Sequence, residues 1–246
     1  MTINKTVFIT GGAKRIGLAT AKYLHSEGYN IIISYNKSNK DAKKIFTELN
    51  LYRKNSCQII KIDFLSIKDY KSISKKIINF FGRVDVLVNN ASKFYPTQIN
   101  KINEKNWHDI IDTNLKAALF FSKSLYSELK KRKGCIINIV DIHVNPPLKD
   151  HIIYNISKAG LLALTKTLAK DLAPSIRVNS ISPGAIMWAE ADVKKINKQK
   201  NILSKIPLNK TGSPDDIAKA ILFLIKDANY ITGQNINIDG GRKLNM

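Results

Sequence analysis

A tyrosine and a lysine lie four residues apart in a stretch of helical pattern, at Tyr154 and Lys158. Residues at positions i and i+4 share one face of a helix, so both side chains can reach one site. An ammonium group beside a phenol favours the phenolate and would lower the tyrosine pKa from its usual value of about 10. A tyrosine with such a pKa can donate or accept a proton near neutral pH. The pair is therefore a candidate for general acid–base chemistry.

Two more polar residues can join this pair. Asp141 follows a strand-like run thirteen residues before Tyr154, and Asn114 lies inside the preceding helical stretch. The carboxyl ends of parallel strands are where open α/β sheets bind ligands. Asp141 is therefore a candidate proton donor or relay, although an aspartate at a strand end can also cap a local turn.

Short β-branched runs alternate with helical stretches, and this alternation positions the candidates. It predicts right-handed βαβ units and an α/β fold: a single doubly wound Rossmann-type domain over residues 1–246, with a seven-stranded parallel sheet flanked by helices. The predicted strands are Thr6–Thr10, Asn30–Tyr35, Gln58–Ile62, Val84–Val88, Cys135–Val140, Arg177–Ile181 and Asn235–Ile238. The predicted helices are Ile16–Glu27, Lys40–Leu51, Ile67–Phe81, Trp107–Lys131, Ile153–Leu172 and Pro214–Ile225. The irregular polar stretch of about 185–208 follows a strand and is a candidate substrate loop.

The first strand leads into the glycine-rich turn TGGAKRIG at 10–17, and a helix follows. Glycines allow a tight turn, close approach of the backbone to a pyrophosphate, and packing of the helix on the strand. The helix N-terminus then offers free N–H groups and a positive dipole end. This context predicts a dinucleotide site.

The end of the second strand indicates which dinucleotide. It carries no Asp or Glu to hold the ribose 2′-OH of NAD, whereas Lys37, Ser38 and Arg15 offer donors and positive charge for a 2′-phosphate. NADPH is therefore expected over NADH, although Lys37 could simply be a solvated lysine. Asp63 could accept a hydrogen bond from the adenine amino group, and Pro183-Gly184 could contact the nicotinamide carboxamide. The expected cofactor-binding residues are Gly11, Arg15, Ile16, Gly17, Tyr35, Asn36, Lys37, Ser38, Asp63, Phe64, Asn90, Ala91, Ser92, Tyr154, Lys158, Pro183 and Gly184.

Composition narrows the class of protein. The net charge is +21, but the lysines are scattered and are not interleaved with aromatics, which argues against a specific nucleic-acid partner. The N-terminus has no room for a signal sequence, and no apolar run approaches the roughly 18 residues of a membrane span. Cys57 and Cys135 form no disulfide framework or metal motif. We expect a cytoplasmic enzyme without a metal site or a membrane partner.

The motifs together resemble the short-chain dehydrogenase/reductase family over essentially the whole chain. The matching segments are TGGAKRIG at 10–17, Asp63, NNA at 89–91, Asn114, IINIV at 136–140, YNISK at 154–158, RVNSISPG at 177–184 and ITGQNINIDGG at 231–241. The resemblance implies that Tyr154 is the catalytic acid and that Lys158 binds the ribose and tunes Tyr154. It also implies that Asn114 supports a proton-relay water, and that the protein is a homotetramer built on the helices around 107–131 and 153–172.

Departures from the common pattern of the family point to one branch of it. Most members have Ser where this chain has Asp141, and Gly where it has Ser92. The segments AKRIG at 13–17, ASKFYP at 91–96 and VDIHVNPPL at 140–148 resemble pteridine reductases. That resemblance places Phe94 on the pterin ring and makes Asp141 and Tyr154 the proton-delivery pair. The expected substrate-binding residues are Arg15, Ser92, Phe94, Asp141, Tyr154 and Trp188.

The leading hypothesis is an NADPH-dependent pteridine reductase that takes 7,8-dihydropterins, including dihydrobiopterin- or dihydromonapterin-like compounds and dihydrofolate, to the tetrahydro level. The alternative enzyme is a 3-oxoacyl-carrier-protein reductase or another carbonyl reductase, for which the serine hydroxyl is needed. A catalytically idle NADP-binding regulator would not require Asn114, Tyr154 and Lys158 together. Phe94 could also be plain core, packed against the loop around Trp188.

Overall fold

All the strands of the central sheet run parallel, in the order β3-β2-β1-β4-β5-β6-β7. This computed structural model describes residues 4–187 and 196–246. The strands are β1 Thr6–Ile9, β2 Asn30–Tyr35, β3 Cys57–Lys61, β4 Val86–Asn89, β5 Cys135–Ile139, β6 Arg177–Pro183 and β7 Asn235–Ile238. The chain reverses its direction of travel across the sheet between β1 and β4, and such a switch point is where open α/β sheets bind ligands. The α/β fold with a seven-stranded parallel sheet is confirmed.

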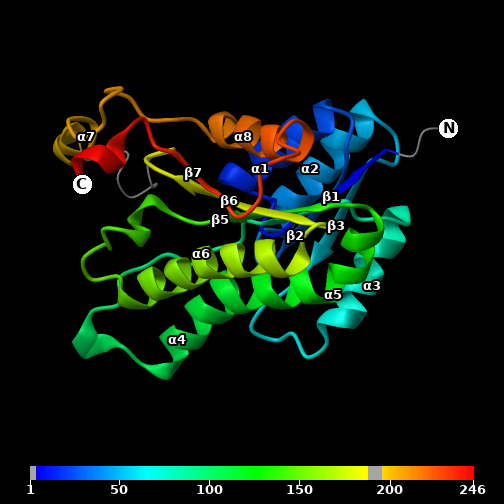
Figure 1. Cartoon of the computed structure of the whole chain (residues 1–246), viewed down its shortest axis with the longest axis horizontal. Helices are drawn as coiled ribbons and strands as arrows, with labels where there is room; N and C mark the ends of the chain where they lie inside the picture. The colour runs from blue at the N-terminus through cyan, green and yellow to red at the C-terminus, as the bar shows by residue number, and fades with distance from the viewer. Residues whose placement is uncertain (1–3, 188–195) are drawn as a thin grey trace.

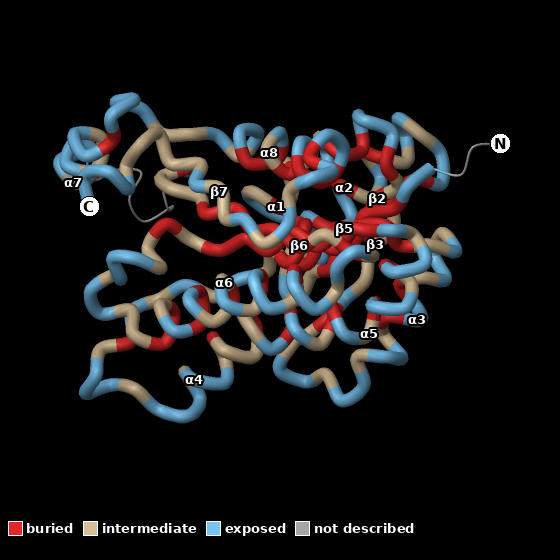
Figure 2. Tube along the Cα trace, viewed as in Figure 1, coloured by how far each residue is buried: buried red, intermediate tan, exposed pale blue. Residues whose placement is uncertain are grey.

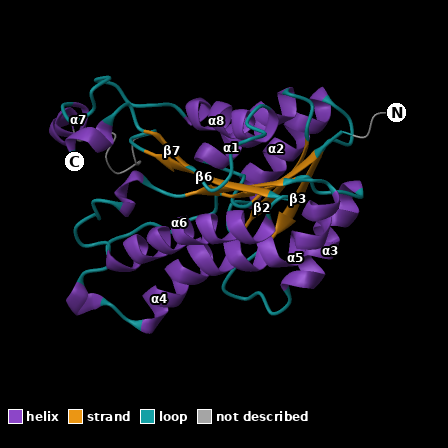
Figure 3. Ribbon diagram, viewed as in Figure 1, coloured by secondary structure: helices purple, strands orange, loops and turns teal. Residues whose placement is uncertain are grey.

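Helices cover both faces of this sheet (Figure 1; Figure 3). In the described ranges the α-helices are α1 Arg15–Ser26, α2 Asn39–Tyr52, α3 Tyr70–Phe81, α4 Glu104–Ile111, α5 Ala117–Lys131, α6 Ile152–Leu172, α7 Ile196–Leu203 and α8 Pro214–Lys226. Helices α1, α2 and α8 lie on one face, and α3, α5 and α6 lie on the other. No helix in these ranges has the length and apolar character needed to cross a bilayer.

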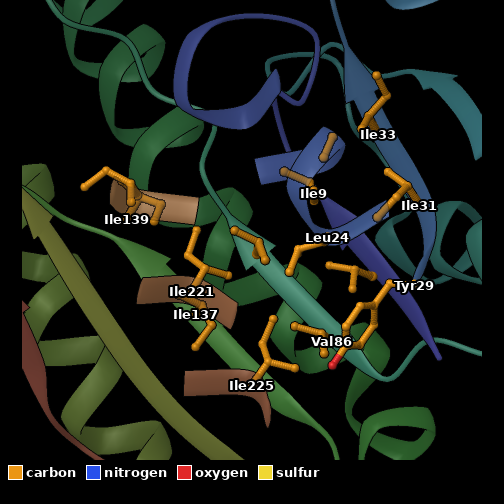
Figure 4. Close-up of a cluster of buried hydrophobic side chains, with 14 of the residues drawn as sticks. Ile9, Leu24, Tyr29, Ile31, Ile33, Val86, Ile137, Ile139, Ile221 and Ile225 are labelled. Atoms are coloured by element: carbon orange, nitrogen blue, oxygen red, sulfur yellow. The ribbon is translucent and has the colours of Figure 1, made fainter. Parts of the chain in front are cut away.

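Alternate residues of the central strands enter two hydrophobic clusters, one on each face of the sheet. In β2, Ile31 and Ile33 belong to the cluster beneath α1, α2 and α8, which Figure 4 shows, whereas Ile32 belongs to the cluster on the α5 side. This follows from the two-residue period of a strand. Figure 2 shows the burial concentrated along the sheet. A sheet covered on both faces explains why its strands read as continuous apolar runs.

A chain of buried amides ties three elements together below the carboxyl edge of the sheet. Asn89 Nδ2 at the end of β4 donates to Asn138 Oδ1 in β5 over 2.8 Å. Asn138 Nδ2 in turn donates to Thr165 Oγ1 of α6 over 2.9 Å. Buried hydrogen bonds of this kind fix register, because leaving any of these groups unpaired is costly. The part of α6 around Thr165 is therefore held at a fixed height relative to β4 and β5.

Two predicted segments contain elements other than the predicted ones. The predicted helix Trp107–Lys131 is α4 and α5 joined by a π-helical stretch, Asp112–Lys116, because one residue more than an α-helix accommodates is present there. The stretch of about 185–208, predicted as irregular, contains α7 at Ile196–Leu203. That helix was missed because its sequence, INKQKNIL, is polar and carries few apolar residues at helical spacing.

Candidate active site

The phenol of Tyr154 and the carboxylate of Asp141 are joined by a hydrogen bond at the carboxyl edge of the sheet. Tyr154, in the first turn of α6, donates from its hydroxyl to Asp141 Oδ2 over 2.6 Å. The other oxygen, Asp141 Oδ1, accepts from the His143 N–H over 2.8 Å and so caps the short 3₁₀ helix Ile142–Val144. The two sequence interpretations of Asp141, capping residue and partner of Tyr154, therefore describe two oxygens of one carboxylate.

Lys158 lies one turn further along α6 and is buried, with 3% of its surface exposed. Its ammonium donates to the carbonyl of Ile139 over 2.8 Å and lies 5.8 Å from the centroid of the Tyr154 ring. Burial lowers the pKa of Lys158 to about 8, although the Asp141 carboxylate acts in the opposite direction. The Lys158 ammonium is thus a buried cation, and keeping it charged near neutral pH costs free energy.

The pKa of Tyr154 shifts in the direction opposite to the one expected from the Tyr–Lys spacing. It is raised well above its ordinary value, first by burial and then by the neighbouring Asp141 carboxylate. The expected lowering by Lys158 is wrong for this arrangement, because the ammonium is bonded to a backbone carbonyl while the carboxylate receives the phenol proton. Tyr154 therefore keeps its proton, which is hydrogen-bonded to Asp141.

Asn114 ties the segment after β4 to helix α6. It lies buried in the π-helical stretch Asp112–Lys116, where its Oδ1 accepts from the Lys93 N–H over 2.7 Å and its Nδ2 donates to the Lys93 carbonyl over 3.0 Å. The same Nδ2 lies 3.0 Å from Ser157 Oγ, and Ser157 donates to the Tyr154 carbonyl over 2.7 Å. Asn114 thereby holds the backbone of residue 93 beside the first turn of α6.

Phe94 is held above the phenol and is largely solvent-accessible. Its side chain is 58% exposed, so it is not a core residue. Its ring stacks on His151 at 4.8 Å between centroids and 16° between planes, and meets Tyr154 edge-on at 4.8 Å and 77°. Ser92, two residues earlier, is exposed. The interpretation of Phe94 as packed core is wrong, and Trp188 lies outside the described residues.

The glycine-rich turn leaves no space for side chains where a pyrophosphate would approach. Gly11 has φ 66°, a region that favours glycine, and its N–H donates to Ser34 Oγ over 3.1 Å. A Cβ at Gly17 would lie 2.4 Å from the Gly11 carbonyl oxygen and 2.6 Å from Asn90 Nδ2. Asn90 closes the turn by donating to the carbonyls of Thr10 and Gly11 over 2.9 and 3.1 Å. This turn fits a dinucleotide phosphate at the start of α1.

The end of β2 offers donors and no carboxylate of its own for a ribose. Tyr35 ends the strand, Lys37 is exposed, and Ser38 is the N-cap of α2 without using its hydroxyl as a cap. Asn36 Nδ2 donates to Asp63 Oδ1 over 3.2 Å, so Asp63 is already engaged with the end of the neighbouring strand. The exposed donors fit a ribose phosphate better than a ribose hydroxyl.

The remaining predicted cofactor residues divide into two groups. Ala91 lies against Gly11, and Pro183 and Gly184 end and follow β6, so these three lie along the carboxyl edge. Ile16 and Phe64 are partly buried and pack against the two hydrophobic clusters. The side chains of Ile16 and Phe64 would therefore support the site from behind, by packing in the core.

Arg15 lies in the glycine-rich turn beside the predicted cofactor residues Ile16 and Gly17, but apart from the predicted substrate-binding residues. Its side chain is exposed and lines a groove between α1 and α8 that also contains Lys22, Met187 and Lys219. In the part of the chain that the structure describes, no hydrogen bond or ring contact joins Arg15 to Asp141 or to any other predicted substrate-binding residue. Its φ of 51° is in the left-handed region, which costs a non-glycine residue roughly 1–2 kcal/mol.

Three residues of this region were missed from the sequence. Ser157 links Asn114 to α6, His151 stacks on Phe94, and Arg242 follows the last strand close to Asp141. Ser157 lies one helical turn after Tyr154, and this spacing could have identified it. An arginine directly after two glycines at a strand end was also a usable signal.

The comparisons with known proteins agree on one family. The family model described as Enoyl-(Acyl carrier protein) reductase matches residues 11–243. The 3-oxoacyl-[acyl-carrier-protein] reductase FabG of Staphylococcus aureus strain Mu50 is 34% identical over 247 residues, covering 98% of this chain and 99% of the relative. The Thermotoga maritima FabG is 35% identical over 249 residues, covering 96% and 97%.

A solved structure is also similar across the whole chain. FolM alternative dihydrofolate reductase 1 from Brucella canis, in complex with NADP, has a TM-score of 0.89 and 29% identity, and the match covers 99% of this chain and 96% of the other. The sheet order, the glycine-rich turn and the Tyr154–Lys158 pair of this chain thus have a common explanation. The chain belongs to the short-chain dehydrogenase/reductase family, whose members are oxidoreductases that use NAD(H) or NADP(H).

Proposed function

We propose that this protein is an NADPH-dependent pteridine reductase. Its substrates would be 7,8-dihydropterins of the dihydrobiopterin or dihydromonapterin type, together with dihydrofolate, reduced to the tetrahydro level. The observation that carries the proposal is the 2.6 Å hydrogen bond from Tyr154 to Asp141, beside the exposed ring of Phe94. Reduction of a C=N bond needs a proton delivered to nitrogen, and an acid–phenol pair suits that task. A flat apolar face suits an aromatic heterocycle.

Each group of residues has a task in this proposal. The bound NADPH would supply the hydride. The glycine-rich turn would hold its pyrophosphate, Lys37 and Ser38 its 2′-phosphate, and Pro183-Gly184 its carboxamide. Lys158 would hold the ribose, as the family resemblance implies. Ser92 and Phe94 would contact the pterin.

Proton delivery would use the hydrogen bond between Tyr154 and Asp141. The proton lies between Tyr154 Oη and Asp141 Oδ2, and the raised pKa of Tyr154 keeps it there at neutral pH. When this proton passes to the ring nitrogen, negative charge is left on the pair. The ammonium of Lys158, 5.8 Å from the Tyr154 ring, offsets that charge.

The alternative function is 3-oxoacyl-carrier-protein reduction, which the Staphylococcus and Thermotoga relatives favour by their names. Against it stands Asp141, where a carbonyl reductase needs a serine hydroxyl. An NADPH-oxidation assay with dihydrobiopterin, dihydrofolate and an acetoacetyl thioester separates the two. Turnover of the thioester alone would overturn the pteridine proposal. Assembly into a homotetramer through the 107–131 and 153–172 helices stays a prediction.

The cofactor should be NADPH rather than NADH. The end of β2 exposes Lys37 and has no carboxylate of its own, so the 2′-phosphate gains contacts that the 2′-OH cannot make. We expect kcat/KM to favour NADPH by at least about tenfold, equivalent to about 1.4 kcal/mol. Initial rates measured with both cofactors at one fixed pterin concentration test this. Equal use of the two would contradict it, and Lys37→Ala should reduce the preference.

Phe94→Ala should raise the KM for dihydropterin by about 5- to 150-fold, the equivalent of a lost stacking contact of roughly 1–3 kcal/mol. Because Phe94 is 58% exposed, the melting temperature and the NADPH affinity should hardly change. Phe94→Leu keeps apolar bulk without an aromatic face and should fall between the two. Phe223→Ala, at a 44% exposed position on α8, is the control for losing a surface aromatic. Loss of stability without a selective pterin defect would contradict the stacking role.

A further inference from the structure

The C-terminal turn of the chain is rigid in its own backbone. After β7 the chain turns through Asp239, Gly240 and Gly241 into a 3₁₀ helix, Arg242–Asn245. Both glycines have positive φ, at 63° and 84°. The Asp239 carboxylate caps the turn, because its two oxygens accept from the Gly241 and Lys243 N–H groups over 3.0 and 2.8 Å. The backbone of Arg242 is thus fixed between two capped residues.

The same turn is locked against its neighbours. The Leu208 N–H donates to the Gly240 carbonyl over 3.1 Å. A Cβ at Gly240 would lie 2.8 Å from the Ile206 side chain, and one at Gly241 would lie 2.9 Å from the Pro207 side chain. These contacts hold the turn on the segment that follows α7, so Arg242 starts from a fixed point at the edge of the sheet.

Sheet topology brings this point to the catalytic pair. Strands β5, β6 and β7 are neighbours and run parallel, so the residues that follow β5 and β7 emerge at the same edge. Asp141 follows β5 and Arg242 follows β7. Their charges interact, and the Arg242 charge also acts on His143. The pKa of Arg242 is lowered by burial, with Asp141 and Asp239 opposing that shift.

Arg242 keeps a hydrogen-bond donor that no group in the described part of the chain uses. Its Nε is buried and has no hydrogen-bond partner among the described atoms. The two nearby carboxylates are already engaged, Asp141 by Tyr154 and His143, and Asp239 by the backbone of its own turn. A buried donor without a partner is unfavourable, and a guanidinium presents a planar set of five N–H donors. An acceptor brought by a ligand would satisfy it.

We propose that Arg242 is a specificity-determining residue that donates to the ring carbonyl oxygen of the bound pyrimidinone. The inference rests on the proposed function, because the pterin supplies that acceptor. A ring whose nitrogen takes its proton from Tyr154 and Asp141 would lie at the same edge of the sheet as Arg242, whose charge interacts with Asp141. The planar guanidinium matches a planar lactam, and its charge strengthens the hydrogen bond. Arg242 thereby favours substrates that carry an oxo group over those with an amino group at this position.

Arg242→Met tests the role through a split between KM and kcat. We expect the KM for dihydropterin to rise by about 10- to 100-fold, the usual effect of losing a hydrogen bond to a charged group. The kcat should change by less than about threefold, because Arg242 takes no part in proton delivery. The melting temperature and the NADPH dissociation constant should stay at wild-type values. Arg242→Lys keeps the charge without the planar fork and should give an intermediate KM. Lys243→Met removes the same charge from the next, exposed residue and should change none of these values.

A matched pair of ligands identifies the acceptor. Binding of a 2-amino-4-oxopteridine should weaken in Arg242→Met, whereas binding of the 2,4-diamino analogue should not. Equal weakening of both, an unchanged KM, or a joint loss of stability and NADPH affinity would overturn the inference. Failure of the proposed function is a separate result, since the wild-type enzyme would then reduce the acetoacetyl thioester and leave dihydropterin untouched.

Discussion

Tyr154→Phe should lower kcat for dihydropterin by on the order of 10²-fold or more. The change removes the hydroxyl that donates to Asp141 and keeps the ring that meets Phe94 edge-on, so substrate and NADPH affinities should be nearly unchanged. Steady-state kinetics with a separate NADPH titration measure both. Wild-type kcat in this variant would show that the proton comes from elsewhere.

Substitutions of Asp141 distinguish the roles of its two carboxylate oxygens, one in capping and one in proton delivery. Asp141→Ala should lose activity to the same extent as Tyr154→Phe. Asp141→Asn can still cap His143 through its amide oxygen, so it should keep the melting temperature and still lose pterin turnover. Asp141→Ser restores the common pattern of the family and should not rescue pterin reduction. Near-normal activity of Asp141→Ala would make Asp141 a structural cap and would return weight to the carbonyl-reductase alternative.

Lys158→Met should give the largest change in the pH dependence of stability. In the folded protein the pKa of Lys158 is lowered from 10.5 to about 8, so between these values the unfolded chain binds more protons than the folded one. The resulting destabilisation is complete below pH 8 and disappears as pH rises to 10.5. At 1.36 kcal/mol per pKa unit it is on the order of 3 kcal/mol. The Lys158→Met variant lacks this destabilisation, and the variant should also lose most of its activity.

Chemical denaturation at pH 7, 8, 9, 10 and 11 measures this difference. The free energy of unfolding of the variant minus that of the wild type should fall by about 3 kcal/mol across this range. The bond from Lys158 to the Ile139 carbonyl is lost at every pH, so it shifts the whole curve without changing its slope. Lys166→Met, at an exposed position on the same helix, is the control and should give a flat difference. A flat curve for Lys158→Met would mean that folding does not shift the pKa of this lysine.

The fold could be predicted from the sequence because its strands are buried on both faces. Runs such as Asn30–Tyr35 and Asn235–Ile238 were identified with the bounds that the structure has. The predicted helix Ile67–Phe81 begins three residues late in the structure, at Tyr70, because Asp69 caps it. Helix α7 was missed because a short polar helix carries little hydrophobic periodicity. Hydrophobic periodicity therefore does not predict where a capping residue starts a helix, nor does it detect short polar helices.

The membership of the candidate site was predicted better than its electrostatics. Spacing placed Tyr154, Lys158 and Asp141 together, and the structure joins Tyr154 to Asp141 by a hydrogen bond and places the Lys158 ammonium 5.8 Å from the Tyr154 ring. Spacing could not show that the Lys158 ammonium donates to a backbone carbonyl. For that reason the pKa of Tyr154 was predicted to be lowered, whereas it is raised. Arg242 was missed because its proximity depends on the parallel pairing of β5, β6 and β7, which a linear motif does not express.

The π-helical stretch Asp112–Lys116 restricts which changes of length the chain can accept. A π turn holds one residue more than an α turn, so a single deletion there would restore regular winding and rotate the following residues by about 100° relative to the preceding ones. Asn114 would then lose its bonds to the backbone of Lys93 and to Ser157. When relatives are aligned, a one-residue gap at 112–116 would therefore mark proteins with a differently built site, even where Tyr154 and Lys158 remain.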